Sequence, residues 1–302
     1  MRLASRAERG RAQSVCESAL MKLSAITDEI SQDFEHALSV MAEYGVAGAE
    51  LRGLWGTNIG ELSEKQAKRA EHALADAGLV VSCLASPFFK CDLAGSEPAT
   101  AGRMHLAQAR SYGEQLDLLD KLCDLADRFG TRLIRVFSFW RRGPLTPQIE
   151  DSIIAAFDEP LAVAERRGVT LCLENEHACY LGTGSEVARV AERIGSPRLA
   201  ICWDPGNALA AGEVPFPNGY EAVRDRVVHV HVKDAVMPAG APEWCVVGEG
   251  VVDYAGQFSA LRDARYEGFI SLETHYIPSG GTNEDGSRPS LAALNRLVKG
   301  RS

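Results

Sequence analysis

The stretch Val227-Val228-His229-Val230-His231-Val232-Lys233-Asp234 alternates apolar and polar side chains along its whole length. Such a period of two predicts a β-strand, with His229, His231 and Lys233 on one face and valines on the other. A surface strand of an antiparallel sheet can alternate in the same way. Two imidazoles and an ammonium are nevertheless an unusual choice for a solvated face, so this strand is a candidate for metal binding or catalysis.

Three further strand-like runs end in a carboxylate at the point where the apolar pattern stops. They are Val169–Leu173 before Glu174, Leu199–Trp203 before Asp204, and Phe269–Leu272 before Glu273. With His231, these residues supply three carboxylates and one imidazole. This set suits one divalent metal ion such as Mn²⁺, Mg²⁺ or Co²⁺ better than a thiolate-preferring metal. The alternative is that each carboxylate caps the helix after its strand.

The composition is that of a globular protein with a substantial core. Of 302 residues, 46% are hydrophobic and 24% are charged, and no apolar run approaches the roughly 20 residues of a membrane span. The net charge of −9 argues against nucleic acid as the main partner and favours a small-molecule substrate. The cysteines form no C-x-x-C pair, as expected for reduced core residues. We therefore expect a cytoplasmic protein that binds neither membrane nor nucleic acid.

The first 20 residues are rich in arginine and lack the apolar core of a secretory signal. We interpret residues 1–20 as a disordered or helical leader, or as sequence that precedes a true start at Met21. The catalytic domain is expected to span residues 21–302.

From Met21 onward, strand-like and helix-like segments alternate, which predicts a parallel sheet with crossover helices. The predicted strands are residues 22–27, 46–51, 79–85, 132–137, 169–174, 199–204, 227–233 and 269–273. The predicted helices are residues 33–44, 63–77, 112–129, 147–167, 185–194, 254–265 and 289–298. Residues 211–218 are interpreted as a link, residues 237–250 as a loop, and residues 86–110 as a long irregular section that is either a lid or an ornament.

Eight predicted strands, seven of them followed by a predicted helix and with no linker between domains, favour a single-domain α/β fold, the (β/α)8 TIM barrel. A doubly wound open sheet is the alternative, but no strand is followed by G-x-G-x-x-G. In a barrel, Glu174, Asp204, His231 and Glu273 would lie on one rim, at the ends of four adjacent strands. The fold therefore strengthens the metal-site interpretation.

At these residues the sequence resembles the xylose-isomerase-like TIM barrels, the sugar phosphate isomerase/epimerase superfamily. The resemblance covers Met21 to Lys299. The motifs that carry it are Leu173-Glu174-Asn175-Glu176, Trp203-Asp204-Pro205-Gly206-Asn207, His229-Val230-His231-Val232-Lys233-Asp234, Gly248-Glu249-Gly250-Val251-Val252-Asp253 and Ser271-Leu272-Glu273.

The resemblance implies that Glu174, Asp204, His231 and Glu273 hold one divalent ion, commonly Mn²⁺, Mg²⁺ or Co²⁺. It also implies that Glu174 and Glu273 act as an acid/base pair at a carbon next to a metal-bound carbonyl, as in the ketose epimerases. Dimers are common in this family, so a homodimer is one expectation.

The sequence departs from the epimerase pattern at two positions. Asn207 replaces a histidine, and Met237 replaces an arginine that contacts substrate. An asparagine can bind a sugar hydroxyl but cannot carry a proton at neutral pH. Both departures count against simple ketose epimerisation, and the missing histidine also counts against a nuclease.

Other polar residues are expected near the same rim. The candidates for substrate binding are Glu50, Arg52, Lys90, Arg135, His177 and Asn207. Lys233 is a candidate catalytic residue that stabilises an oxyanion or acts as a base, or else it pairs with Glu249 or Asp234. A buried Arg135 would need Glu50 or Glu174 as its partner, and His229 is interpreted as a core residue or one that supports a ligand.

Four functions compete. The first is a metal-dependent isomerase or epimerase of a carbohydrate or keto-sugar, in which Glu174 and Glu273 exchange protons. The second is a lyase or dehydratase, for example on inososes or 3-keto-glycosides, in which Lys233 or His177 protonates the leaving group. The third is a sugar-binding module without turnover, and the fourth is a nuclease, which the net charge disfavours.

Overall fold

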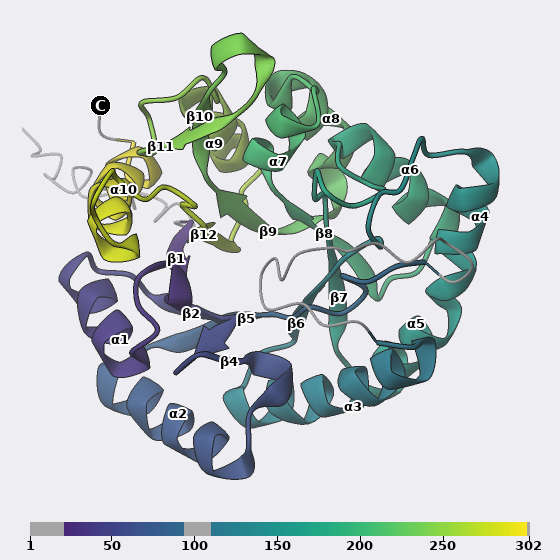
Figure 1. The fold of residues 1–302 in the computed structure, drawn as a ribbon, viewed down its shortest axis with the longest axis horizontal. Helices are drawn as coiled ribbons and strands as arrows, with labels where there is room; N and C mark the ends of the chain where they lie inside the picture. Colours follow the sequence, from purple (N-terminus) through teal and green to yellow (C-terminus); the bar gives the residue numbers. More distant parts are fainter. Residues whose placement is uncertain (1–20, 94–109, 301–302) are drawn as a thin grey trace, which may run out of the picture.

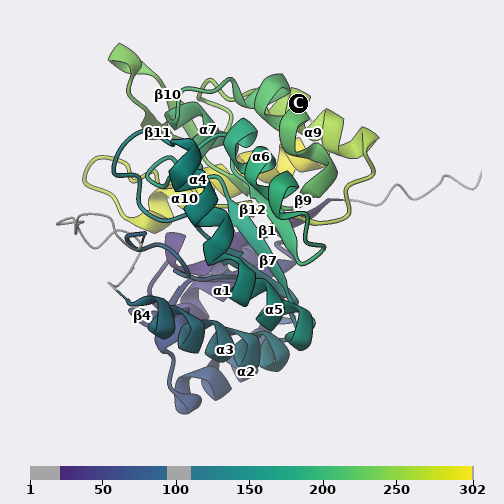
Figure 2. The same ribbon diagram turned by 90° about the vertical axis from the view of Figure 1, so that its right-hand side faces the viewer.

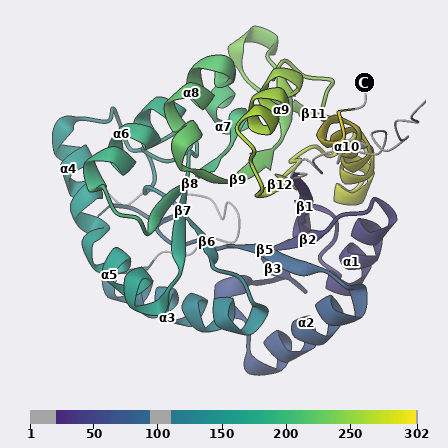
Figure 3. The ribbon, with the colours of Figure 1, turned by 180° about the vertical axis from the view of Figure 1, so that it is seen from behind.

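The computed structural model describes residues 21–93 and 110–300. Eight parallel strands close into a barrel in the order β1-β12-β9-β8-β7-β6-β5-β2, with the helices outside it (Figure 1). The same closed ring is seen from its other end in Figure 3. The barrel confirms the predicted TIM-barrel fold. Its strands are β1 (Lys22–Ile26), β2 (Gly48–Leu51), β5 (Val80–Ala85), β6 (Leu133–Val136), β7 (Thr170–Glu174), β8 (Leu199–Trp203), β9 (Val227–Val232) and β12 (Phe269–Leu272).

The outer layer consists of helices between successive strands. They are α1 (Phe34–Glu43), α2 (Glu64–Ala77), α3 (Tyr112–Phe129), α4 (Pro147–Ala156), α5 (Asp158–Arg167), α6 (Gly184–Ile194), α7 (Pro205–Ala210), α8 (Tyr220–Val223), α9 (Tyr254–Asp263) and α10 (Asn283–Val298). Their apolar faces pack on the strands, and residues such as Phe34, Phe157 and Phe258 are fully buried there. Burial between helices and strands supplies most of the stabilisation of this architecture.

Local signals in the sequence set most helix boundaries. Ser63 caps α2 in a capping box with Gln66, and Gly78, Gly130 and Gly168 end α2, α3 and α5 with positive φ angles. Glycine adopts this left-handed conformation without the penalty of a Cβ atom. The predicted ends of these three helices are therefore confirmed.

The helix predicted over residues 147–167 is instead two helices, α4 and α5, which meet at Phe157. Pro160 explains the break. In a continuous helix its ring would meet the carbonyl of Ala156, and it has no N–H to donate to that carbonyl. Within the first turn of a new helix, the same proline is tolerated.

The last helix begins at Asn283, six residues before the predicted start at Pro289. Thr282 and Asp285 form the capping box, and Pro289 lies inside the helix. The prediction used Pro289 as a first-turn residue, whereas the capping pair decides the start.

The segments between the barrel strands include two short hairpins, and one of them corrects a loop prediction. Residues 237–250 are not a plain loop, because β11 (Glu243–Cys245) pairs in an antiparallel hairpin with β10 (Asp234–Val236). A second hairpin, β3 (Gly53–Leu54) with β4 (Thr57–Asn58), follows β2. The link over residues 211–218 lies between the short helices α7 and α8. The labels β10, β11 and β4 appear at the same end of the barrel in Figure 2.

In the described ranges, no helix is both long and apolar enough to cross a membrane. The proposed leader and most of the proposed lid, residues 94–109, lie outside those ranges.

Candidate functional site

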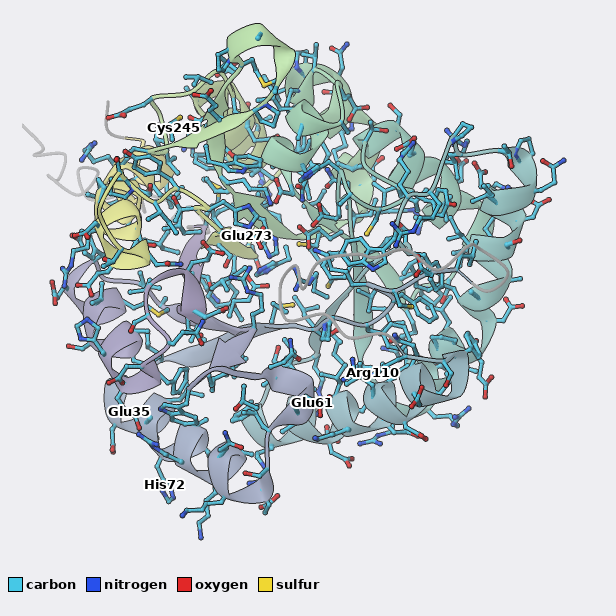
Figure 4. The ribbon with its side chains drawn as sticks, viewed as in Figure 1. Glu35, Glu61, His72, Arg110, Cys245 and Glu273 are labelled. Carbon is cyan, nitrogen blue, oxygen red and sulfur yellow. The ribbon has the colours of Figure 1, made fainter. Side chains whose placement is uncertain are left out.

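Glu174, Asp204, His231 and Glu273 meet at one end of the barrel. Each offers a ligand atom, and these atoms all lie within 4.8 Å of one another. Glu174 ends β7, Asp204 follows β8, His231 belongs to β9 and Glu273 follows β12, which are four adjacent strands of the barrel. All four are buried. Figure 4 shows Glu273 toward the middle of the barrel in the view down its axis.

The Nδ1 atom of His231 faces the carboxylates of the other residues of this four-residue cluster. Nδ1 lies 3.3 Å from Glu174 Oε1 and 3.5 Å from Glu273 Oε2. The other nitrogen, Nε2, lies 3.0 Å from Glu50 Oε1, and His229 Nε2 lies 2.8 Å from Glu50 Oε2. A carboxylate that accepts from Nε2–H leaves the Nδ1 lone pair free for a cation. Glu50 therefore orients both histidines, although the sequence suggested it as a substrate contact.

Asp204 divides its two oxygens between helix capping and the cluster. Its Oδ1 accepts from the backbone N–H of Asn207 at the start of α7. Its Oδ2 lies 2.7 Å from Lys233 Nζ but makes no hydrogen bond of proper geometry. Capping and a ligand role are thus compatible in Asp204, because they use different oxygens.

Lys233 is fully buried, and its ammonium also donates to Glu273 Oε2 at 2.8 Å. The alternative suggested from the sequence, a pair with Glu249 or Asp234, is wrong, because the partners of Lys233 are Asp204 and Glu273. Asp234 instead accepts backbone N–H groups of the loop that follows β11. Burial acts to lower the pKa of Lys233, but Asp204 and the nearby glutamates raise it well above its ordinary value.

Each glutamate of the cluster is held by a buried arginine. Arg135 Nη1 donates to Glu174 Oε2 at 2.8 Å. Glu174 is one of the two partners that the sequence suggested for Arg135. Asn207 Nδ2 donates to Glu174 Oε1 at 3.0 Å. Arg52 Nη1 donates to Glu273 Oε1 at 2.9 Å. These bonds fix the orientation of both carboxylates before any ligand arrives.

The charged neighbours keep the two glutamates ionised. Burial acts to raise the pKa of Glu174, but His231 and Arg135 lower it. Burial also acts to raise the pKa of Glu273, but Lys233 and His275 bring this pKa well below its ordinary value. The pKa of Asp204 is raised, because burial outweighs the effect of Lys233 there.

A second charged group lies beside the cluster. Lys90 Nζ is buried, donates to Glu176 Oε2 at 2.8 Å and lies 4.2 Å from the ring centre of Phe137. Glu176 Oε1 lies 3.0 Å from His177 Nδ1. Glu176 was not among the site residues predicted from the sequence, although its place in the run from Glu174 to His177 at a strand end was a signal for it.

His177 joins this group to the cluster through Asn207. Its Nδ1 lies 2.8 Å from Asn207 Oδ1, and the side chain is one-third exposed. Burial acts to lower the pKa of His177, but Glu176 and Asn207 raise it above the ordinary value. A partly exposed, readily protonated imidazole can give a proton to a bound molecule.

The residues present fit a divalent cation. Three carboxylates and one imidazole form a hard to borderline donor set, and Asp204 Oδ2 is a buried oxygen that faces the Lys233 ammonium at 2.7 Å without a hydrogen bond of proper geometry. Glu174, Asp204, His231 and Glu273 would hold such an ion. The identity of the ion and the role of each residue stay predictions.

Known proteins resemble this chain over most of its length. The 3-oxo-isoapionate decarboxylase of Pectobacterium atrosepticum is 27% identical over 223 residues, which cover 68% of this chain and 78% of the relative. The inosose dehydratase of Geobacillus thermodenitrificans is 22% identical over 262 residues, which cover 82% and 83%. A xylose isomerase-like TIM barrel protein from Mycobacterium smegmatis, solved with magnesium, has a TM-score of 0.69 and 16% identity, and the match covers 94% of this chain and 98% of that one.

These comparisons support an enzyme of the sugar-modifying kind, since the relatives are named as a decarboxylase and dehydratases. The family model described as xylose isomerase-like TIM barrel matches residues 38–297. The chain belongs to the xylose isomerase-like TIM barrel family.

Proposed function

We propose that the chain is a divalent-metal-dependent lyase that acts on a small polyhydroxylated keto compound, such as an inosose or a 3-keto-glycoside. The observation that carries this proposal is the four-residue cluster with two cationic donors at its edge, Lys233 and His177. The names of the relatives support it, since decarboxylation and dehydration both pass through negative charge next to a carbonyl. Mn²⁺, Mg²⁺ and Co²⁺ all suit the donor set.

A divalent ion at the cluster would lower the energy of negative charge on the carbonyl oxygen of the substrate. The chain's own groups move the protons. Glu273, held as a carboxylate, removes the proton from the carbon beside the carbonyl. The electron pair then expels a hydroxyl from the next carbon, and His177 supplies the proton that makes it water. Lys233 adds a fixed positive charge beside the reacting oxygen.

The second candidate is an isomerase or epimerase of a carbohydrate or keto-sugar. One observation favours it: Glu174 and Glu273 reach the cluster from β7 and β12, with β8 and β9 between them in the barrel. Two carboxylates that approach from separate directions can remove a proton on one face of a carbon and return it on the other. In this reaction His177 has no leaving group to protonate.

NMR in D₂O separates the two reactions. The Mg²⁺-loaded protein is incubated with a panel of ketoses, inososes and 3-keto-glycosides. Loss of water or of an aglycone supports the lyase, whereas deuterium next to the carbonyl of an isomeric product supports the epimerase. No change with any compound, despite stoichiometric metal, contradicts both for this panel.

Two variants test the assigned roles. Glu273→Gln should abolish turnover and retain much of the metal, because an amide cannot act as the base but keeps one ligand oxygen. His177→Gln should slow the lyase reaction and leave hydrogen exchange next to the carbonyl largely intact, because exchange does not need the acid. Normal turnover in Glu273→Gln would contradict the proton-transfer mechanism.

A further inference from the structure

Trp244 lies on β11, in the hairpin that follows the strand of His231. Trp244 is only partly buried. Lys233 Nζ lies 5.6 Å from the centre of its ring. His275 meets the ring edge-on at 5.5 Å, and His177 is tilted against it at 6.4 Å. One flat indole therefore extends from His177 to His275 beside Lys233.

Asp234 holds this hairpin in place. Its carboxylate accepts N–H bonds from Gly248, Gly250 and Val252 at 2.9, 3.1 and 3.3 Å, and it is fully buried. A Cβ atom on Gly250 would lie 2.0 Å from Asp234 Oδ1, so only glycine permits this close approach. Asp234 is also the first residue of β10, the strand that pairs with β11. Its hydrogen bonds therefore fix the hairpin that carries the indole of Trp244.

Trp244 is thus a rigid, partly buried aromatic ring at the edge of a highly polar site. Such rings bind ligands through burial of apolar area, while nearby polar groups fix orientation. A cyclic polyol or a sugar ring has a flat face of C–H groups and an edge of hydroxyl groups. An open-chain polyol has no such face in a single conformation, so it would lose more conformational freedom on stacking.

We propose that Trp244 is a specificity-determining residue that packs on the C–H face of a ring-shaped polyhydroxylated substrate, with the ring hydroxyls directed toward the four-residue cluster. This inference rests on the proposed function, and it narrows the substrate class to cyclic compounds. The indole also shields the reacting carbon from water when the ring is bound.

Calorimetric binding to the Mg²⁺-loaded protein tests this proposal with two probes that lack a carbonyl and cannot react. The probes are myo-inositol, which is cyclic, and sorbitol, which is an open chain. Trp244→Leu should weaken the binding of myo-inositol about threefold to tenfold, and Trp244→Phe should retain most of it. The affinity for sorbitol should stay the same in all three proteins.

Trp55→Phe is the matched control, because Trp55 packs on Phe34 and Arg69 and bonds to Glu35, none of which belongs to the cluster. A general effect on folding would change the binding affinities for both probes equally, whereas a role of Trp244 in specificity would change the ratio of the two affinities. Equal losses for both probes in Trp244→Leu, or no binding of myo-inositol by the unmodified protein, overturns the proposal. The proposed lyase reaction can fail independently of this proposal. In that case the protein shows no turnover, while its binding of myo-inositol still depends on Trp244.

Discussion

Replacing Glu50 with glutamine tests how His231 is prepared for a cation. The two oxygens of Glu50 each bond to a histidine, with distances of 3.0 Å to His231 Nε2 and 2.8 Å to His229 Nε2. A glutamine offers one accepting oxygen and one donating NH₂ group. Only one imidazole can therefore keep its acceptor. If His231 faces the NH₂ group, its proton moves to Nδ1, the nitrogen directed at the cluster.

The size of the effect follows from this loss of orientation. Removing the partner of a metal-binding histidine typically weakens metal affinity about 10-fold to 100-fold, which corresponds to about 1.4–2.8 kcal/mol. The metal-free protein also loses a hydrogen bond to a charged group. All three side chains are fully buried, so the free energy of unfolding should fall by about 1.5–3 kcal/mol.

The assay is a calorimetric titration with Mn²⁺, combined with urea unfolding of the metal-free protein. Glu249→Gln is the matched control, because Glu249 is an exposed glutamate that bonds through its backbone N–H to Val246. A Glu50→Gln protein that binds Mn²⁺ as tightly as the unmodified protein would refute the role assigned to Glu50. Loss of stability without loss of affinity would assign Glu50 to folding alone.

Three further outcomes are expected. Burial acts to raise the pKa of Glu176, but Lys90 and the other cationic neighbours of Glu176 hold this pKa well below 4.5. The ionised carboxylate therefore stabilises the fold above pH 4.5, and this stabilisation is lost as the pH falls toward the folded-state pKa. Glu176→Gln should show a shallower loss of stability to urea on acidification. Gly250→Ala places a Cβ atom 2.0 Å from Asp234 Oδ1 and should cost about 1–3 kcal/mol in thermal unfolding, whereas Gly113→Ala, with open space around its Cβ, should not destabilise. Mn²⁺ at about 100 times its Kd should raise the free energy of unfolding by about 2.7 kcal/mol, and a chelator should reverse the gain; an unchanged melting temperature would contradict a metal site in the folded chain.

The sequence alone was sufficient to predict the barrel and the meeting of the four residues of the cluster. Alternating strand and helix patterns identify parallel strands, and the carboxyl ends of parallel strands lie at one end of a barrel. Acids after β7, β8 and β12 and a histidine in β9 must then lie near one another. Neither step requires knowledge of a single side-chain contact.

The partners of the charged groups were decided by tertiary structure. Glu50 bonds to His229 and His231 across the barrel interior, because β12 and β1 lie between β9 and β2 in the ring. Lys233 pairs with Asp204 and Glu273 rather than with its neighbours in sequence. Such pairings depend on strand register and on which way each side chain points, and residue patterns carry little information about either.

The hairpin of β10 and β11 also combines features that the sequence predicts with features that only the tertiary structure decides. Gly248 and Gly250 were recognisable as a motif, but the antiparallel pairing and the place of Trp244 beside Lys233 were not. The buried carboxylate of Asp234 gathers several N–H groups that are distant in the chain. Which N–H groups this carboxylate collects depends on the path of the loop in space, so the tertiary structure decides where the indole lies.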